Sequence, residues 1–156
     1  MRHRRIALLS SPTSYRTPAF LAAAERLKLE VIHIVDTPEA LAREWRRPEA
    51  IDFSRPEAAA ARIVELVRER PVDAVVPVDD SATLLAALVA SRLGLPHNDP
   101  DAALAARDKL RMRERLHAHG VPVPRFRPYP AAIDPHSIAQ EIEYPCVVKP
   151  TLLSGS

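Results

Sequence analysis

The stretch DAVVPVDDSATLLAALVASRLG, residues 73–94, predicts the fold of this chain. Its opening residues, 73–78, are a short apolar run of the kind that forms a buried strand. The residues that follow carry apolar side chains at helical spacing and lead to Gly94, a residue type that commonly lies just beyond the last turn of a helix. A buried strand that runs directly into a helix is typical of parallel strand–helix units, so the stretch predicts an α/β fold.

The same alternation recurs upstream of this stretch. Apolar runs predict strands at 4–11, 31–35 and, marginally, 50–53, and apolar residues at helical spacing predict helices at 17–30, 38–45 and 56–70. Thr17 is the expected N-cap of the first helix, with Pro18 at its first helical position. Together these elements predict an open parallel, Rossmann-like sheet with helices on both faces.

The character of the sequence changes after Gly94, which predicts a domain organisation. We expect an α/β domain over 1–94, a helical linker over 95–120, and the beginning of a further, incomplete domain over 121–156. This last part has a proline-rich extended segment, a small helix and an apolar run at Cys146, Val147 and Val148 that predicts a strand. Cys146 is expected to be a small buried residue on that strand.

Composition excludes several classes of protein. With 47% hydrophobic and 27% charged residues the chain is expected to be globular, and a net charge of only +2, spread along helix faces, argues against nucleic-acid binding. After the basic start, the apolar run Ile6–Leu9 is too short for an export or membrane segment. A single cysteine excludes an internal disulfide framework, so we expect a cytoplasmic protein that does not contact membranes.

Common nucleotide and metal motifs are absent. The segment after the first strand, SSPTSYRTP, has no glycine, which argues against a dinucleotide site, and no Gly-x-x-x-x-Gly-Lys-Ser/Thr loop occurs. His117 and His119 are two residues apart and do not share a helix face. No metal-ligand set and no catalytic residue is predicted in this chain.

Lysine is rare here, with 3 lysines against 19 arginines. A lysine kept in such a chain is a candidate for a role that needs a compact ammonium, such as phosphate binding. Lys28 is explained as a helix-end residue. Lys109 and Lys149 are the candidates, and for each the alternative is an ordinary solvated lysine.

Three segments in order along the chain resemble the ATP-grasp ligase superfamily. Residues 72–96 resemble the last strand and helix of its small α/β domain, the pre-ATP-grasp domain, and 93–126 resemble the junction into its ATP-binding half. Residues 144–156, YPCVVKPTLLSGS, resemble its strand ending in Lys-Pro before a glycine- and serine-rich flap. The pattern is most similar to the L-amino-acid ligase and carbamoyl-phosphate-synthase-like group.

This resemblance implies an enzyme that uses ATP and Mg²⁺ to convert a carboxylate into an acyl phosphate, which an amine then attacks. Lys109 and Lys149 match the family lysines that contact the nucleotide phosphates, and Ser154, Gly155 and Ser156 match the start of the phosphate flap. The implied partners are ATP and a small carboxylate or amino acid, and many relatives form homodimers.

The family's adenine-binding segment, magnesium-binding acids and transition-state arginine follow the flap and match no position here. The resemblance therefore implies that the chain is the front portion of a ligase, cut inside the flap, and that this portion alone is inactive. Magnesium would be held by residues of the full-length parent.

A second candidate site is expected at the carboxyl ends of the first and fourth strands, the usual ligand edge of an open α/β sheet. Arg16 could bind a substrate carboxylate, and Asp79 and Asp80 could bind a substrate amine. Helix capping by Asp80 or Ser81 is the simpler interpretation. Arg16 is the member that capping explains least.

Two other functions remain open. The chain could be a non-catalytic α/β module that binds a small molecule or a protein. The Asp79–Asp80 pair also fits, less well, a receiver- or flavodoxin-like signalling domain, because the first strand offers no acid beside that pair.

Overall fold

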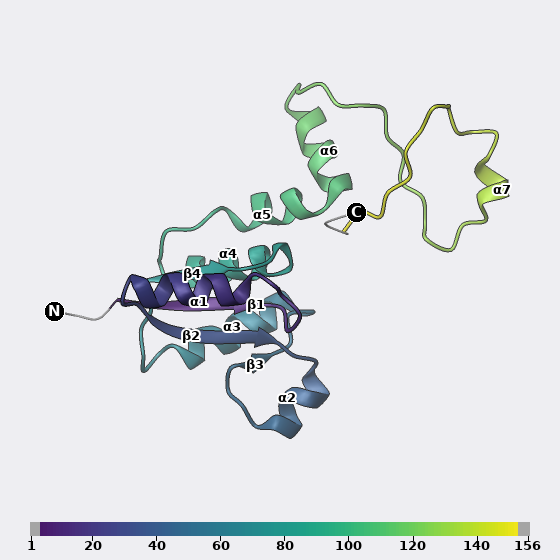
Figure 1. Ribbon diagram of the computed structural model, residues 1–156. Coiled ribbons are helices and arrows are strands. Elements are labelled where there is room, and N and C mark those ends of the chain that lie inside the picture. Colours follow the sequence, from purple (N-terminus) through teal and green to yellow (C-terminus); the bar gives the residue numbers. More distant parts are fainter. Residues whose placement is uncertain (1–3, 153–156) are drawn as a thin grey trace. The chain divides into compact units, whose positions relative to one another are not determined.

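A parallel four-stranded sheet forms the centre of the first part of the protein in a computed structural model that describes residues 4–152 (Figure 1). The strands are β1 (Arg5–Ser10), β2 (Glu30–Asp36), β3 (Ala50–Ile51) and β4 (Ala74–Pro77), in the order β3-β2-β1-β4. β1 and β2 pair along the whole of β1, from Arg5 opposite Glu30 to Ser10 opposite Val35. The predicted open parallel α/β sheet is confirmed.

Helices connect the strands and continue beyond the last of them. Within the described residues they are α1 (Thr17–Arg26), α2 (Glu39–Trp45), α3 (Pro56–Leu66), the short 3-10 helix η1 (Asp80–Ala82), α4 (Thr83–Arg92), α5 (Pro100–Arg107), α6 (Lys109–Ala118) and α7 (Pro135–Ile138). α4 ends as predicted: Gly94 adopts φ +66°, and its N–H and that of Leu95 bond carbonyls of the last turn.

The core lies on one face of the sheet, beneath α3 and α4. Alternate residues of the central strands point toward these helices because side chains of a strand alternate between faces. The buried cluster joins β1 and β2 to α3 and α4, and it includes Leu9, Ile34, Ile63, Leu85 and Val89. α1 covers the opposite face, where Leu8 and Ala24 are buried (Figure 1).

Two helix starts differ from the predicted capping. Arg16, not Thr17, occupies the cap position of α1, and Thr17 lies inside the helix with its hydroxyl oxygen buried and unpaired. Neither Asp80 nor Ser81 caps α4, because both lie within η1, and α4 begins after Ala82 without a side-chain cap. The interpretation of Asp80 or Ser81 as the cap of α4 is therefore wrong.

The chain divides into two compact units, 1–104 and 105–156, with the division inside α5. Within residues 105–152 of the second unit the structure contains helices and irregular segments but no strand. The domain boundaries predicted at 94 and 120 stay a prediction.

The strand predicted at Cys146 is not present. Residues 145–150 are irregular, Cys146 is exposed, and Val147 and Val148 are 77% and 87% exposed. A strand needs a neighbour to pair its backbone groups, and residues 105–152 contain no strand that could pair with it. The expectation that Cys146 is buried is wrong for the same reason.

Candidate functional site

The loops after β1 and β4 are joined by hydrogen bonds at one edge of the sheet. These two strands are neighbours, with Leu9 opposite Pro77, so their carboxyl ends lie together. The Asp79 carboxylate accepts a bond from the Ser11 N–H at 3.0 Å, one from the Ser11 hydroxyl at 3.1 Å, and one from the Ser14 hydroxyl at 2.7 Å. The residues that follow β1 and β4 thus lie close together, as predicted. The Asp79 carboxylate, however, already accepts hydrogen bonds from Ser11 and Ser14.

The ionisation of Asp79 reflects this set of donors. Burial alone raises the pKa of its carboxyl group, but the bonds from Ser14 and Ser11 and the positive charge of Arg16 outweigh burial, so the pKa lies below its ordinary value. Asp79 is therefore a charged group that holds two loops together.

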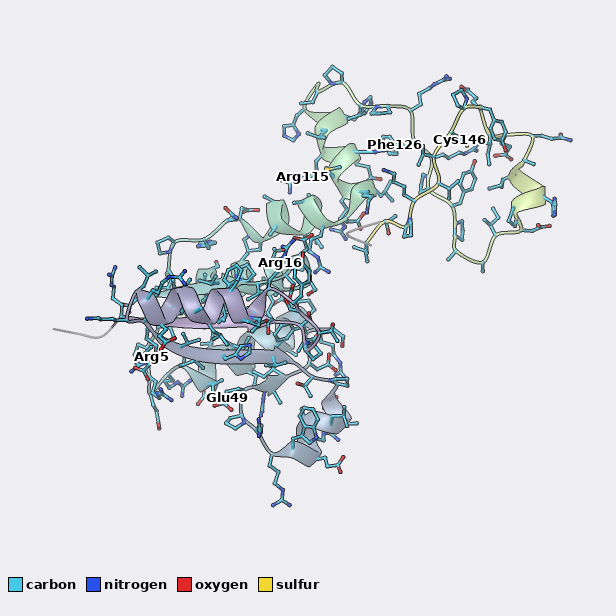
Figure 2. All side chains as sticks on the ribbon, in the orientation of Figure 1. Arg5, Arg16, Glu49, Arg115, Phe126 and Cys146 are labelled. Atoms are coloured by element: carbon cyan, nitrogen blue, oxygen red, sulfur yellow. The ribbon has the colours of Figure 1, made fainter. Side chains whose placement is uncertain are left out.

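Arg16, labelled in Figure 2, and Asp80 are both exposed to solvent. The Arg16 guanidinium donates from Nε to the Tyr15 hydroxyl at 3.2 Å and lies 5.5 Å from the centroid of that exposed ring. The Tyr15 hydroxyl raises the pKa of Arg16, and Asp80 and Asp79 raise it further. An accessible arginine and an accessible carboxylate thus lie at the ligand edge.

A polar pair of one buried and one half-buried residue, which sequence reasoning did not identify, lies on the α1 face of the sheet. Ser10 is 1% exposed and its hydroxyl lies 2.9 Å from Nε2 of His33. These residues share a face because His33 is opposite Leu8, two residues before Ser10. Burial lowers the pKa of His33. The signal in the sequence is the single polar residue within the apolar run VIHIV.

We predict that His33 makes stability fall in mild acid. Because the folded pKa of His33 is below the unfolded value near 6.5, the unfolded state binds more protons in this range. The contribution of neutral His33 to the free energy of unfolding is therefore complete above a pH of about 6.5 and decreases as the pH falls below that value. Urea unfolding at about pH 7.5 and about pH 5.5 should show a smaller pH difference for His33→Gln. The exposed control His117→Gln should keep the wild-type difference, and an equal reduction in both variants would contradict the assignment.

The second candidate site lies at the start of α6, in the second unit. Lys109 is the first residue of this helix, half-buried, and its backbone N–H donates to the Thr151 carbonyl at 3.0 Å. Thr151 follows the exposed Lys149 by two residues. The structure therefore brings together the two lysine-bearing segments, which are 40 residues apart in the sequence numbering.

Asp108 caps α6 and offsets the unfavourable position of Lys109. Its carboxylate accepts from the N–H groups of Leu110 and Arg111 at 2.9 and 3.2 Å. A negative charge at a helix N-terminus is favourable, whereas the cation that follows it is slightly unfavourable. Sequence reasoning missed Asp108, although an aspartate directly before a helix is a recognisable signal.

We predict that Asp108→Ala destabilises α6 by about 1 kcal/mol, because two N–H groups lose their acceptor. Asp108→Asn retains an acceptor and should lose less than half as much. Amide hydrogen exchange of α6 provides the measurement. Equal protection of α6 in Asp108→Ala and in the wild type would contradict the capping role of Asp108.

Ser154, Gly155 and Ser156, the predicted flap residues, lie outside the described residues. Within 4–152, no group of three His, Cys, Asp or Glu side chains is arranged to hold a metal ion. No helix in that range is long and apolar enough to cross a membrane.

Comparisons with known proteins agree with the fold. The ATP-grasp N-terminal domain model matches residues 20–97, half of the chain. The uncharacterized protein y4rH of Sinorhizobium fredii is 26% identical over 156 residues, which cover 98% of this chain and 33% of that protein. The carbamoyl phosphate synthase large chain of Rubrobacter xylanophilus is 26% identical over 129 residues, 81% of this chain and 12% of that one.

Among solved structures, the L-amino acid ligase from Bacillus licheniformis matches with a TM-score of 0.71 and 22% identity, over 97% of this chain and 38% of that one. The likeness shows a shared fold. The chain thus spans about a third of the length of y4rH and of the ligase. Since the family model covers half of its residues, this chain belongs to the ATP-grasp N-terminal domain family.

Proposed function

We propose that the protein containing this chain is an ATP-dependent ligase that joins a carboxylate to an amine through an acyl phosphate. The observation that carries the proposal is the bond from the Lys109 N–H to the Thr151 carbonyl, because it holds the two lysine segments in one place. Membership of the ATP-grasp N-terminal domain family supports the same function.

In the proposed reaction, a carboxylate oxygen of the substrate attacks the γ-phosphorus of ATP and ADP leaves. The amine nitrogen then attacks the acyl carbon, the bond from that carbon to the phosphate oxygen breaks, and inorganic phosphate leaves while the nitrogen loses a proton. Lys109 and Lys149 supply positive charge to the phosphates without covalent chemistry. Ser154, Gly155 and Ser156 would bring backbone N–H groups to the same oxygens.

Family resemblance implies Mg²⁺ as well as ATP. The described residues 4–152 contain no group of three His, Cys, Asp or Glu side chains that could hold it.

The edge formed by the β1 and β4 loops is the proposed place for an amino-acid substrate. Of the three residues predicted there, Asp79 bonds to Ser11 and Ser14. Arg16 and Asp80 are exposed and would bind the carboxylate and the ammonium group respectively.

The test uses the protein as its native host produces it, because the chain spans about a third of the relatives' length. With ATP, Mg²⁺ and a mixture of amino acids, the proposal predicts ADP, phosphate and an amide-linked product detected by mass spectrometry. Omitting the amino acids should stop ADP formation. Nucleotide-independent ligand binding with no ADP would overturn the proposal in favour of a binding module.

A further inference from the structure

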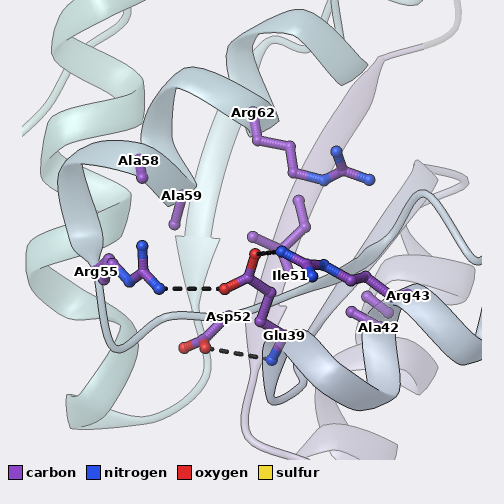
Figure 3. Close-up of a pocket in the computed structure, with 10 residues that line it drawn as sticks. Glu39, Ala42, Arg43, Ile51, Asp52, Arg55, Ala58, Ala59 and Arg62 are labelled. Carbon is purple, nitrogen blue, oxygen red and sulfur yellow. Dashed lines mark hydrogen bonds and ion pairs between the residues drawn. The ribbon is translucent and has the colours of Figure 1, made fainter.

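A small cavity lies at the edge of the sheet opposite β4, between α2, β3 and α3, with a volume of about 240 Å³ (Figure 3). Drug-sized ligands occupy cavities of roughly 300 Å³ and above, so this one suits a smaller molecule. It belongs to the first unit and lies beside β3, the edge strand opposite β4, whereas Asp79 follows β4 and Arg16 follows the inner strand β1.

Three arginines line this cavity, and their charges exceed those of the acids beside them. Arg43 and Arg55 both donate to the Glu39 carboxylate, Arg55 at 3.1 Å. Arg62 has no acidic partner among the described residues, and Figure 3 shows it without an interaction to either acid. With Glu39 and Asp52 as the lining acids, the side chains sum to one excess positive charge.

The two lining acids do not pair with all the N–H donors of the three arginines. Each guanidinium has five N–H donors. Glu39 accepts one hydrogen bond from Arg43 and one from Arg55. These pairs are exposed, and exposed ion pairs contribute at most about 1 kcal/mol. Asp52 is used elsewhere, because its carboxylate accepts from the N–H of Ser54 at 2.8 Å. A ligand anion could therefore replace Glu39 at small cost.

The rest of the lining is apolar. It consists of four alanines and one isoleucine on the three surrounding elements: Ala42, Ala50, Ile51, Ala58 and Ala59. Ala50, Ile51 and Ala59 are buried and support this wall from behind, so Ala42 and Ala58 supply most of the apolar surface that a ligand can reach. An apolar body would lie against it while an anionic group meets the arginines.

We propose that this cavity binds a small monocarboxylate with an apolar body. One negative charge neutralises the excess charge of the lining, whereas a dianion would reverse it. Arg62 would bind the two carboxylate oxygens through paired N–H groups, the favoured geometry for a guanidinium. The site shares no residue with the proposed nucleotide and amino-acid sites and does not depend on the proposed function.

The test titrates the chain with 3-methylbutanoate in ligand-detected NMR. We expect saturable binding, and at least tenfold weaker binding of the neutral isostere 3-methylbutanamide, because the charge-assisted bonds are lost. Arg62→Gln should weaken 3-methylbutanoate binding about tenfold. The matched control Arg26→Gln, which removes the same charge from exposed α1, should leave it unchanged.

A second pair of variants separates loss of binding from loss of structure. Ala58→Leu fills the cavity from an exposed position of α3, and Ala61→Leu adds the same side chain to the same helix away from the lining. Only Ala58→Leu should abolish binding, with helix content equal in both. Absence of saturable binding, equal binding of the amide, tighter binding of inorganic phosphate, or equal effects within either pair of variants would overturn the proposal.

Discussion

Replacing Lys149 with alanine in the protein from the native host is expected to lower kcat/KM for ATP-dependent amide formation about 100-fold or more. The proposed role is to place one positive charge where charge develops on the transferred phosphoryl group, and loss of a single such group typically costs this much. Lys149 is exposed and lies in an irregular segment, so its removal should leave the fold intact. Steady-state kinetics with varied ATP provide the measurement.

The matched control for Lys149→Ala is Lys28→Ala, which removes an exposed lysine from the turn between α1 and β2. It should retain wild-type kinetics. Lys149→Arg keeps the charge but changes its shape, so it should recover only part of the loss. Equal kinetics for Lys149→Ala and Lys28→Ala would remove Lys149 from the proposed site.

Replacing Asp79 with alanine is expected to lower the free energy of unfolding by about 2–3 kcal/mol. Its carboxylate accepts three hydrogen bonds from Ser11 and Ser14, and bonds to a charged group contribute about 1.5–3 kcal/mol each, without being additive. Because Asp79 is partly exposed, its three hydrogen bonds together should contribute about as much as one such bond. Urea unfolding at about pH 7, followed by circular dichroism, measures the effect.

Asp80→Ala is the matched control, because Asp80 is the adjacent exposed acid. It should change stability by less than about 0.5 kcal/mol. The cost of Asp79→Ala should also decrease in acid. The pKa of Asp79 is lowered in the folded protein, so its contribution is complete above the unfolded pKa near 3.8 and is lost as the pH falls through the folded pKa. Equal destabilisation by both variants would contradict the assigned role.

Much of the α/β unit could be predicted from the sequence because its patterns are local. The apolar run that predicted β4 is followed closely by the apolar residues at helical spacing that predicted the helix ending before Gly94. The proximity of Arg16 and Asp79 was predictable because both follow neighbouring parallel strands. The partners of Asp79 were not, since they depend on the path of the loop that carries Ser11 and Ser14.

Other features depend on contacts that a pattern does not contain. The apolar run at Cys146 predicted a strand, but a strand forms only where a neighbour pairs with it, and residues 105–152 contain none. The excess of arginine around Arg62 was equally hidden, because the lining residues come from three elements and the loop between β3 and α3. One of these, β3, is a strand of only two residues.

The central claim is that a carboxylate is activated as an acyl phosphate, and the transfer of ¹⁸O tests it most directly. The protein from the native host would be incubated with ATP, Mg²⁺ and amino acids carrying ¹⁸O in their carboxylates. We predict that the released inorganic phosphate carries one ¹⁸O atom for each amide formed, because the oxygen shared by the acyl group and the phosphate leaves with phosphorus. Amide formation with ¹⁸O in AMP, or with unlabelled phosphate, would contradict the acyl-phosphate route.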